Sequence, residues 1–366
     1  IISGYAAKST SSSIFVANRS VALTNATDNN FSPINLANTA VSRENNFALA
    51  STLGMLPRKA VYRKGLGSVL ITKGYDVNKK ELIPKRSIIN TSLTYPFGEN
   101  SQKDTLFNTI NYEKLDSAVS SIFENSYQTR AVLVLYKNQL IVERYGKGFT
   151  KDSRMLGWSM TKSILSTVYG IMQYQGKLSV QDRAPILEWE NDDRKEITLH
   201  NLLQMNSGLA WDENYDKISD VTKMLFLEDD MTKMQQKQQL VDSPNFSWNY
   251  SSGTSNLLSG ILRKKLGNQQ EYLDYWYREL IDKIGMNSMI VETDVKGHYV
   301  ASSYAWATAR DWAKFGLLYL HKGNWNGTQI FSPEWVDYIT QPTPTSNNSY
   351  GAHFWLNAGN KMKDVP

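Results

Sequence analysis

The chain contains no cysteine and no long apolar run, and it has only four histidines in 366 residues. The absence of cysteine excludes disulfides, thiolate metal ligands and a cysteine nucleophile. No run of 18 apolar residues occurs, so the sequence predicts no membrane span. The histidines lie far apart in the sequence and form neither a His-x-His nor a His-Glu-x-x-His pattern, so we predict no metal site and no cofactor. Convergence of distant residues in the fold is the alternative that the sequence leaves open. They are His200, His298, His321 and His353.

Length and charge limit the class of partner. A chain of 366 residues with 20% charged residues can bury a full core, so a globular protein is expected. Lys and Arg number 40 against 35 Asp and Glu, and these charges are scattered rather than gathered in a basic stripe. Nucleic acid is therefore not an expected partner, and the oligomeric state is left open. Because the chain begins at Ile1 without Met or an apolar leader, we expect a processed chain.

The periodicity of apolar residues predicts an α+β fold. Residues 130–146 are typical of a β-hairpin, because two runs of β-branched and aromatic residues flank Lys137-Asn138. Residues 1–60 are rich in Ser, Asn, Thr and Ala and predict an irregular N-terminal lobe before a domain at residues 61–366. Strands followed by a mostly helical stretch favour α+β. Apolar residues recur at helical spacing over residues 159–175, 199–205, 256–266, 271–284 and 308–321.

The segment Ser159-Met160-Thr161-Lys162 is the only Ser-x-x-Lys in the chain. On a helix, residues i and i+3 share a face with Cβ atoms roughly 5–6 Å apart, so the Lys162 amine can reach the Ser159 hydroxyl. Serine is a poor nucleophile unless a neighbour takes its proton. The residues that follow are apolar nearly all round, which predicts a buried helix that disfavours the charged form of Lys162. The motif alone is weak evidence for a nucleophilic serine, because such a four-residue pattern can arise by chance in a chain of this length.

A second segment offers a phenol. Tyr250-Ser251-Ser252 lies in a polar turn before the helix predicted at residues 256–266, and such a turn can present a side chain to a cleft. Tyrosine acts as a base only if nearby cations lower its pKa, and Lys162 is the obvious candidate. The plainer alternative is that Tyr250 packs like most of the 20 tyrosines.

Together these segments resemble the serine β-lactamase and penicillin-binding protein superfamily. The similarity favours the branch of class C β-lactamases, D-amino-acid peptidases, esterases and 6-aminohexanoate-dimer (nylon oligomer) hydrolases. That fold has an antiparallel sheet flanked by helices and a largely helical second lobe. The resemblance covers roughly residues 60–366. It rests on SMTK at 159–162, ITLHNLLQMNSGL at 197–209, YSS at 250–252, KIGMNSM at 283–289 and ARDWAKFGLLYL at 309–320.

The resemblance implies roles for individual residues. Ser159 would be the nucleophile, Lys162 its proton acceptor and Tyr250 a general acid and base acting on a small amide or ester. Ser252 stands where class C β-lactamases usually have Asn, which argues against β-lactam turnover as the natural activity. The loop WDENYD at residues 211–216 looks most like the amide-oligomer hydrolases, so Tyr215 and Ser252 are predicted to contact substrate. Ordinary loop packing is the alternative for Tyr215.

One family motif is missing. A Lys or His followed by x-Gly, on a strand lining the cleft, does not occur before Pro366, and His353 is followed by Phe354-Trp355 instead. We interpret His353 as a packed histidine. The resemblance implies further C-terminal strands, so we expect the sequence to be cut short. Family habit also predicts a periplasmic or secreted protein, with a cytoplasmic one as the alternative.

Two other functions compete with hydrolysis. A catalytically silent lactamase-like protein could bind peptidoglycan or a glycan through its 10 Trp and 20 Tyr residues. A glycosidase with paired carboxylates is suggested by acidic clusters such as Glu228-Asp229-Asp230, although adjacent acids are usually surface. A catalytically silent binding protein would have no physical need of Ser159, Lys162 and Tyr250 together, so hydrolysis is favoured.

Overall fold

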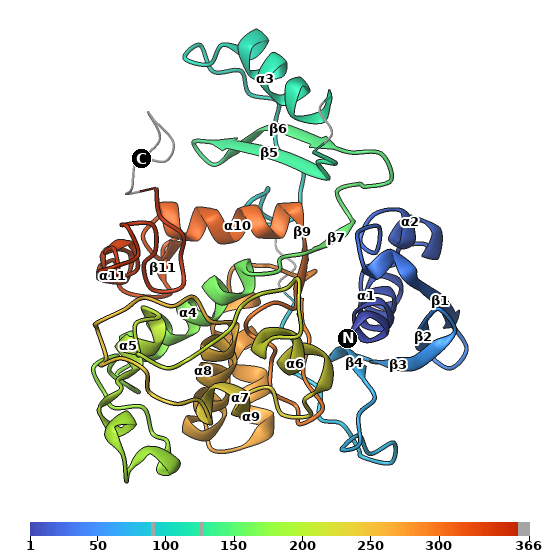
Figure 1. The fold of residues 1–366 in the computed structure, drawn as a ribbon. Helices are drawn as coiled ribbons and strands as arrows, with labels where there is room; N and C mark the ends of the chain where they lie inside the picture. The colour runs from blue at the N-terminus through green and yellow to red at the C-terminus, as the bar shows by residue number, and fades with distance from the viewer. Residues whose placement is uncertain (89–91, 125–126, 358–366) are drawn as a thin grey trace.

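The computed structural model describes residues 1–88, 92–124 and 127–357 and shows a helical body with small antiparallel sheets around it (Figure 1). The predicted α+β class is confirmed. Of the domain predicted at 61–366, residues 89–91, 125–126 and 358–366 lie outside the described residues. No helix among the described residues is both long enough and apolar enough to cross a membrane.

The prediction of an irregular N-terminal lobe is wrong. Residues 1–60 contain a 14-residue helix and most of a four-stranded antiparallel sheet in the order β1-β2-β3-β4. Strand β3 runs through the predicted boundary at residue 60 and pairs with β4, so the sheet joins the two predicted parts. The elements are α1 (Ile2–Phe15), α2 (Val21–Ala26), the short 3₁₀ helix η1 (Ile34–Leu36), β1 (Ala37–Ser42), β2 (Phe47–Thr52), β3 (Met55–Arg63) and β4 (Gly67–Leu70).

Buried polar side chains explain why the composition of residues 1–60 wrongly predicted an irregular segment. Helix α1 lies against the sheet (Figure 1). Most of its small Ser and Thr residues are buried rather than exposed. Most of these hydroxyls have partners: Ser11 Oγ donates to Ser68 Oγ at 2.8 Å, and Thr10 Oγ1 accepts from Asn29 Nδ2 at 3.0 Å. The buried Ser13 Oγ has no hydrogen-bond partner among the described residues. A polar group can be buried at little cost when it is hydrogen-bonded. Composition alone therefore resembles that of a loop, whereas the segment is a core helix.

The predicted hairpin at residues 130–146 is confirmed. Strands β5 (Ala131–Tyr136) and β6 (Gln139–Tyr145) pair antiparallel, with Tyr136 opposite Gln139 and a shift of register between Val134 and Leu135. Lys137 and Asn138 have φ of 48° and 61°, the left-handed pair that a two-residue hairpin turn requires. Helix α3 (Tyr112–Glu124) lies beside this hairpin, away from the helical body (Figure 1).

All five predicted helices exist, with shifted ends. The largest shift is in α8, which begins at Ser252 because the Ser251 hydroxyl caps it by accepting from Thr254 N at 2.9 Å. The predicted helix at 271–284 is α9 followed by a π-helical turn, η4. The body consists of α4 (Met160–Tyr174), η2 (Leu187–Trp189), η3 (Asp193–Glu196), α5 (Leu199–Leu203), α6 (Asp220–Leu227), α7 (Lys233–Gln236), α8 (Ser252–Lys265), α9 (Gln269–Trp276), η4 (Tyr277–Ile281), α10 (Ala309–Leu320) and α11 (Glu334–Thr340).

A three-stranded sheet connects the helical body to the N-terminal lobe. Its order is β7-β9-β8, so β9 is central and leads directly into α10. The Gly157 N–H donates to Ala305 O at 2.8 Å, which ties the chain just before α4 to β9. The sheet thereby fixes the start of α4. Its strands are β7 (Arg154–Leu156), β8 (Ile290–Val291) and β9 (Ala305–Thr308), and a separate hairpin comprises β10 (Asn324–Trp325) and β11 (Thr328–Gln329).

Candidate active site

Ser159 sits at the turn that starts helix α4. Trp158, the residue before it, has φ of 43°, a left-handed conformation that is costly for a bulky side chain. Ser159 follows as the N-terminal flanking residue of α4 and is half-buried. Its N–H donates to no other described residue, so this amide is free to bind an oxygen at the helix start. The strained turn therefore places the hydroxyl and a free N–H of one residue at the start of the helix.

Lys162 is fully enclosed beside this serine, as the spacing predicts. It is 1% exposed, and its Nζ donates to Ser159 Oγ at 3.3 Å and to Ser252 Oγ at 3.0 Å. A third bond, at 2.9 Å, goes to the carbonyl oxygen of Ser302. The three acceptors fix the amine between α4 and the first residue of α8. The arrangement places a nitrogen where it can exchange a proton with Ser159 Oγ.

Tyr250 faces the same amine from the turn before α8. Lys162 Nζ lies 4.9 Å from the centre of the Tyr250 ring. The ring is held by other aromatic side chains, with centroids 5.3 Å from Trp355 and 5.7 Å from Tyr350. The Tyr250 hydroxyl makes no hydrogen bond to another described residue. The structure thus brings Ser159, Lys162 and Tyr250 together and leaves the phenol oxygen free for substrate or water.

A carboxylate that the sequence analysis did not single out completes the site. Glu213 accepts from Ser252 N at 2.8 Å through Oε2, and from Ser252 Oγ at 2.5 Å and Tyr215 OH at 2.8 Å through Oε1. Burial, together with this carboxylate, raises the pKa of Tyr215, so its phenol remains a neutral donor. Ser252 Oγ therefore links Glu213 to Lys162, while Tyr215 stays 54% exposed at the rim.

We expect Glu213→Gln to lower kcat/KM by about 10–100-fold. A hydrogen bond to a charged group contributes about 1.5–3 kcal/mol, and each 1.4 kcal/mol corresponds to about tenfold in rate. The neutral amide would leave Ser252 and Tyr215 without their shared anion and would loosen the position of Lys162. Steady-state kinetics with one chromogenic ester would measure the loss. Glu190→Gln is the control, because Glu190 is exposed and does not line the cavity beside Ser159. Equal effects of the two substitutions would contradict the role of Glu213.

An apolar cavity of about 540 Å³ opens beside Ser159. Its walls come from four parts of the chain: the first turn of α1, the segment around η1, the turn before α4, and α6 with the loop before it. Tyr215, Asp216 and Lys217 supply its polar edge. Most of a ligand pocket is usually apolar with a few placed polar groups. The apolar lining consists of Ile1, Ile2, Tyr5, Phe31, Pro33, Ile34, Trp158, Ile218, Leu225 and Phe226.

His353 is a packed histidine, as predicted. It is 2% exposed, with Nδ1 2.7 Å from Leu203 O and Nε2 3.0 Å from Ser255 Oγ. Because a carbonyl only accepts, Nδ1 carries the proton and Nε2 accepts from Ser255. Burial lowers the pKa of His353 to about 3 and so keeps it neutral. It supports α5 and α8 rather than the cavity.

Two contributors were missed for different reasons. Glu213 lies within the WDENYD segment that had been noted, two residues before Tyr215, so that segment carried the signal. Ser302 contributes only a backbone carbonyl, which no side-chain pattern reveals. No metal ligands had been assigned. Within the described ranges, the one group of at least three His, Asp or Glu side chains close enough to share a cation is Asp230, Asp294 and His298, outside this site.

Comparison with known proteins identifies the family. The protein-family model described as Beta-lactamase matches residues 116–362, which is more than half of the chain. The chain belongs to the β-lactamase family. The match includes the segments with Ser159, Lys162 and Tyr250, so the expected membership is confirmed. Members of this family are serine hydrolases and amidases that act on small amide or ester substrates.

Individual relatives are distant. The curated 6-aminohexanoate-dimer hydrolase of Paenarthrobacter ureafaciens is 24% identical, over 58% of this chain and 57% of its own length. The chain therefore spans little more than half of that relative. A Bacillus anthracis structure provisionally described as a 6-aminohexanoate-dimer hydrolase has TM-score 0.58 and 22% identity, covering 65% of this chain and 67% of its own. A provisionally described β-lactamase from Bacteroides dorei has TM-score 0.56 and 19% identity, covering 67% and 79%. Both structures confirm the β-lactamase-like fold.

Proposed function

We propose that this member of the β-lactamase family cleaves an amide or ester through an acyl-enzyme on Ser159. The observation that carries the proposal is the contact of Lys162 Nζ with Ser159 Oγ at 3.3 Å, beside a 540 Å³ apolar cavity. A nucleophile next to its proton acceptor is the basic requirement for covalent catalysis by serine. The contacts of Glu213 and Ser302 support it, because they hold the lysine and its surroundings in one arrangement.

Acylation follows from these positions. In its neutral form Lys162 accepts the Ser159 proton while Oγ attacks the carbonyl carbon of the substrate. The negative charge that develops on the carbonyl oxygen is stabilised by the Ser159 N–H, which has no other partner among the described residues. Tyr250, with its hydroxyl free and its ring 4.9 Å from Lys162 Nζ, donates a proton to the departing amine or alcohol. The acyl group then remains on Ser159 Oγ.

Deacylation reverses these roles. A water molecule gives a proton to Tyr250 and attacks the acyl carbon, and Ser159 Oγ leaves with a proton returned from Lys162. The amine or alcohol is thus released before water enters. Ping-pong kinetics are expected for such a sequence.

The cavity favours a linear substrate with an apolar stretch. Its walls are mostly aliphatic and aromatic, and its polar groups lie at the edge, where Lys217 and Asp216 could meet the ends of a chain molecule. The relative from Paenarthrobacter ureafaciens is named for a linear amide dimer. Ser252, where class C β-lactamases usually have Asn, is occupied by its bonds to Lys162 and Glu213. We therefore propose linear amides or esters, rather than β-lactams, as the natural class.

A labelling experiment followed by a substrate panel tests this function. A fluorophosphonate probe should add once per chain, and peptide mapping should find it on Ser159. A linear amide dimer and a p-nitrophenyl ester should be hydrolysed with higher kcat/KM than a chromogenic cephalosporin or a D-Ala-D-Ala peptide. Absence of labelling would contradict the enzyme and favour the silent glycan-binding protein. Labelling with preference for the cephalosporin would refute only the substrate class.

A further inference from the structure

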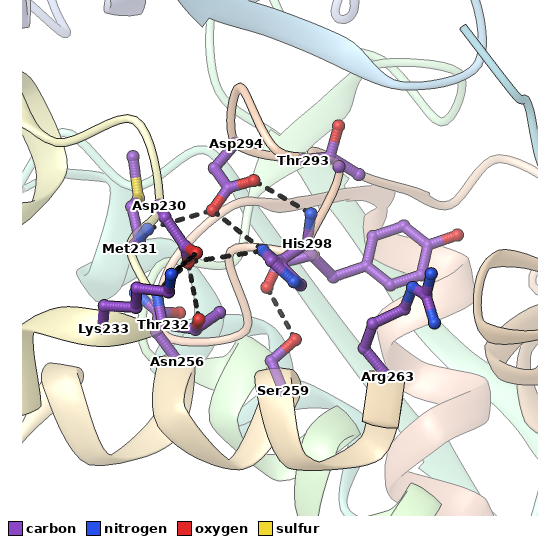
Figure 2. Close-up of polar contacts among 12 residues, drawn as sticks. Asp230, Met231, Thr232, Lys233, Asn256, Ser259, Arg263, Thr293, Asp294 and His298 are labelled. Carbon is purple, nitrogen blue, oxygen red and sulfur yellow. Dashed lines mark hydrogen bonds and ion pairs between the residues drawn. The ribbon is translucent and has the colours of Figure 1, made fainter. Parts of the chain in front are cut away.

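Three side chains from two loops converge above helix α8, outside the candidate active site (Figure 2). Asp230 lies between α6 and α7, whereas Asp294 and His298 belong to the turn between β8 and β9. The Asp294 side chain is fully buried, and those of Asp230 and His298 are each 17% exposed. Each offers a ligand atom, and all three atoms lie within 4.8 Å of one another.

The spacing does not suit direct hydrogen bonds. His298 Nδ1 is 3.5 Å from Asp230 Oδ1 and 3.5 Å from Asp294 Oδ2. A good N–H···O bond is about 2.7–3.2 Å long, and this buried nitrogen has no hydrogen-bond partner. Two ligands on a tetrahedral metal, each bonded at about 2.1 Å, stand roughly 3.4 Å apart. The His298 nitrogen therefore lies from each carboxylate oxygen at the separation of two ligands that share one ion, and all three ligand atoms lie within 4.8 Å of one another.

The carboxylates are held in place by backbone groups. Asp294 Oδ1 accepts from His298 N at 2.9 Å, and Oδ2 accepts from Met231 N at 3.0 Å (Figure 2). Asp230 Oδ1 accepts from Thr232 N at 3.1 Å. Such outer bonds orient ligands before an ion binds and are typical of metal sites. The cluster is thus ordered by its own chain.

The donor set of this cluster suits a divalent cation. Two carboxylates contribute two negative charges, and the nearest cation to Asp230 is Lys233 Nζ at 3.8 Å, on a side chain that is 59% exposed. Arg263 also approaches His298 from α8. An imidazole with two carboxylates suits Zn²⁺ or Mn²⁺ better than Ca²⁺, which takes six to eight oxygens.

We propose that Asp230, Asp294 and His298 bind one divalent transition-metal ion at a structural site. The ion would join the loop before α7 to the turn that continues to Ser302. Ser302 N donates to Asn256 Oδ1 at 3.1 Å, and Ser302 O accepts from Lys162 Nζ. Binding therefore steadies a segment that reaches the candidate active site, without contact between the ion and Ser159.

A proton is the competing occupant of this cluster. Burial lowers the pKa of His298, but Asp294 and Asp230 outweigh the burial and raise it above its usual value. A protonated His298 would satisfy both carboxylates, whereas a metal needs the neutral ring. A metal ion and a proton therefore compete for the same His298 nitrogen.

Zinc binding to the full chain tests the proposal. Protein dialysed against EDTA and then into chelator-free buffer at pH 7.5 is titrated with ZnCl₂ by calorimetry, and bound zinc is counted by elemental analysis. One ion per chain and a rise in Tm are expected. His298→Gln, at a residue that lies apart from the catalytic groups, should weaken Kd by at least on the order of 100-fold, more than loss of a group that only orients a ligand.

A matched histidine variant makes the outcome specific. His321→Gln removes a histidine of similar exposure that bonds Asn138 Oδ1 at 2.7 Å, and it should bind zinc like the wild type. No saturable binding to the wild-type chain, or equal binding by His298→Gln, would overturn the site in favour of a proton. Asp230→Asn offers a second ligand variant if His298→Gln fails to fold, and it should lose binding too.

Discussion

Substitution of Ser159 by alanine is expected to lower kcat/KM by on the order of 10⁴-fold or more while the chain still folds. The loss follows from chemistry, because Ser159 lines the cavity and its hydroxyl is bonded to the buried Lys162 amine. Ser252 Oγ, the other hydroxyl bonded to this amine, is also engaged by Glu213. Steady-state kinetics on the best substrate of the panel measures the loss. Far-ultraviolet circular dichroism and urea unfolding verify the fold.

Ser163→Ala is the matched control on the same helix. Ser163 Oγ donates to His353 O at 2.9 Å and is not among the hydrogen-bond partners of Lys162, so its loss should cost about 1 kcal/mol of stability and little activity. Retention of most of the wild-type rate by Ser159→Ala would exclude the acyl-enzyme. An equal loss in Ser163→Ala would mean that the helix, rather than the nucleophile, had been damaged.

Lys162→Met extends this prediction to the proton acceptor. Methionine nearly matches the length and volume of the buried lysine stem, so the core around α4 should remain filled. Removal of a general base typically costs about 10²–10⁴-fold in rate. The loss should be smaller than for Ser159→Ala, because the hydroxyl and its free N–H remain. Slower fluorophosphonate labelling of Lys162→Met, with folding intact, would separate base from scaffold.

The parts of this molecule that could be predicted are those encoded locally. The β5–β6 hairpin depends on Lys137-Asn138, and the pairing of Ser159 with Lys162 depends on one helical turn. Tyr250 needed the family resemblance, because only the fold brings it to Lys162. In each case the sequence contained the deciding residues within a few positions or within a recognised motif.

The parts that were missed depend on contacts between distant segments. Helix α1 looked irregular because its buried Ser and Thr residues find their partners on later segments, such as Ser68 on β4 and Asn29 after α2. Asp230 approaches Asp294 and His298 only when two separate loops meet. The acidic run at residues 228–230 was interpreted as surface, yet its last residue, Asp230, is mostly buried. It faces Asp294, which belongs to a distant loop and is entirely buried. The spacing of apolar residues along the sequence cannot predict such contacts between distant segments.

Lys8 of helix α1 and Glu292, just after β8, form a buried ion pair between the N-terminal helix and the body. Glu292 is 0% exposed and accepts from Lys8 Nζ at 2.6 Å and Ser12 Oγ at 2.8 Å on α1. It also accepts from Ser68 N at 2.7 Å and Trp306 Nε1 at 3.0 Å. Burial lowers the pKa of Lys8, and the charge of Glu292 opposes that effect. All four donors therefore depend on one carboxylate.

The close approach around this carboxylate leaves no room for rearrangement. Gly67, at the start of β4, has φ of 73°, and a Cβ there would lie 2.3 Å from Glu292 Cγ. A left-handed conformation and the lack of a side chain are both needed at this point. The carboxylate is consequently packed against the backbone of β4 and cannot swing away if its charge is removed.

We expect Glu292→Gln to reduce the free energy of unfolding by about 3–5 kcal/mol, because it leaves the Lys8 ammonium buried without its partner. Urea unfolding followed by fluorescence measures the change. Asp152→Asn is the control, since Lys151 and Asp152 are 58% and 77% exposed and such a pair contributes about 0–1 kcal/mol. The double variant Lys8→Met with Glu292→Gln should lose less than the sum of the two single losses, whereas additive losses would contradict the pairing.

The same substitution also tests whether α1 shapes the substrate cavity. Ile2 and Tyr5, in the first turn of α1, line the cavity beside Ser159, and Lys8 follows one turn later. Loosening α1 in Glu292→Gln should therefore raise KM for substrates with an apolar chain more than it lowers kcat. The rate of fluorophosphonate labelling at Ser159 should change less, because the Lys162 contacts involve no residue of α1. A fall in kcat with unchanged KM would instead place α1 in control of the catalytic groups.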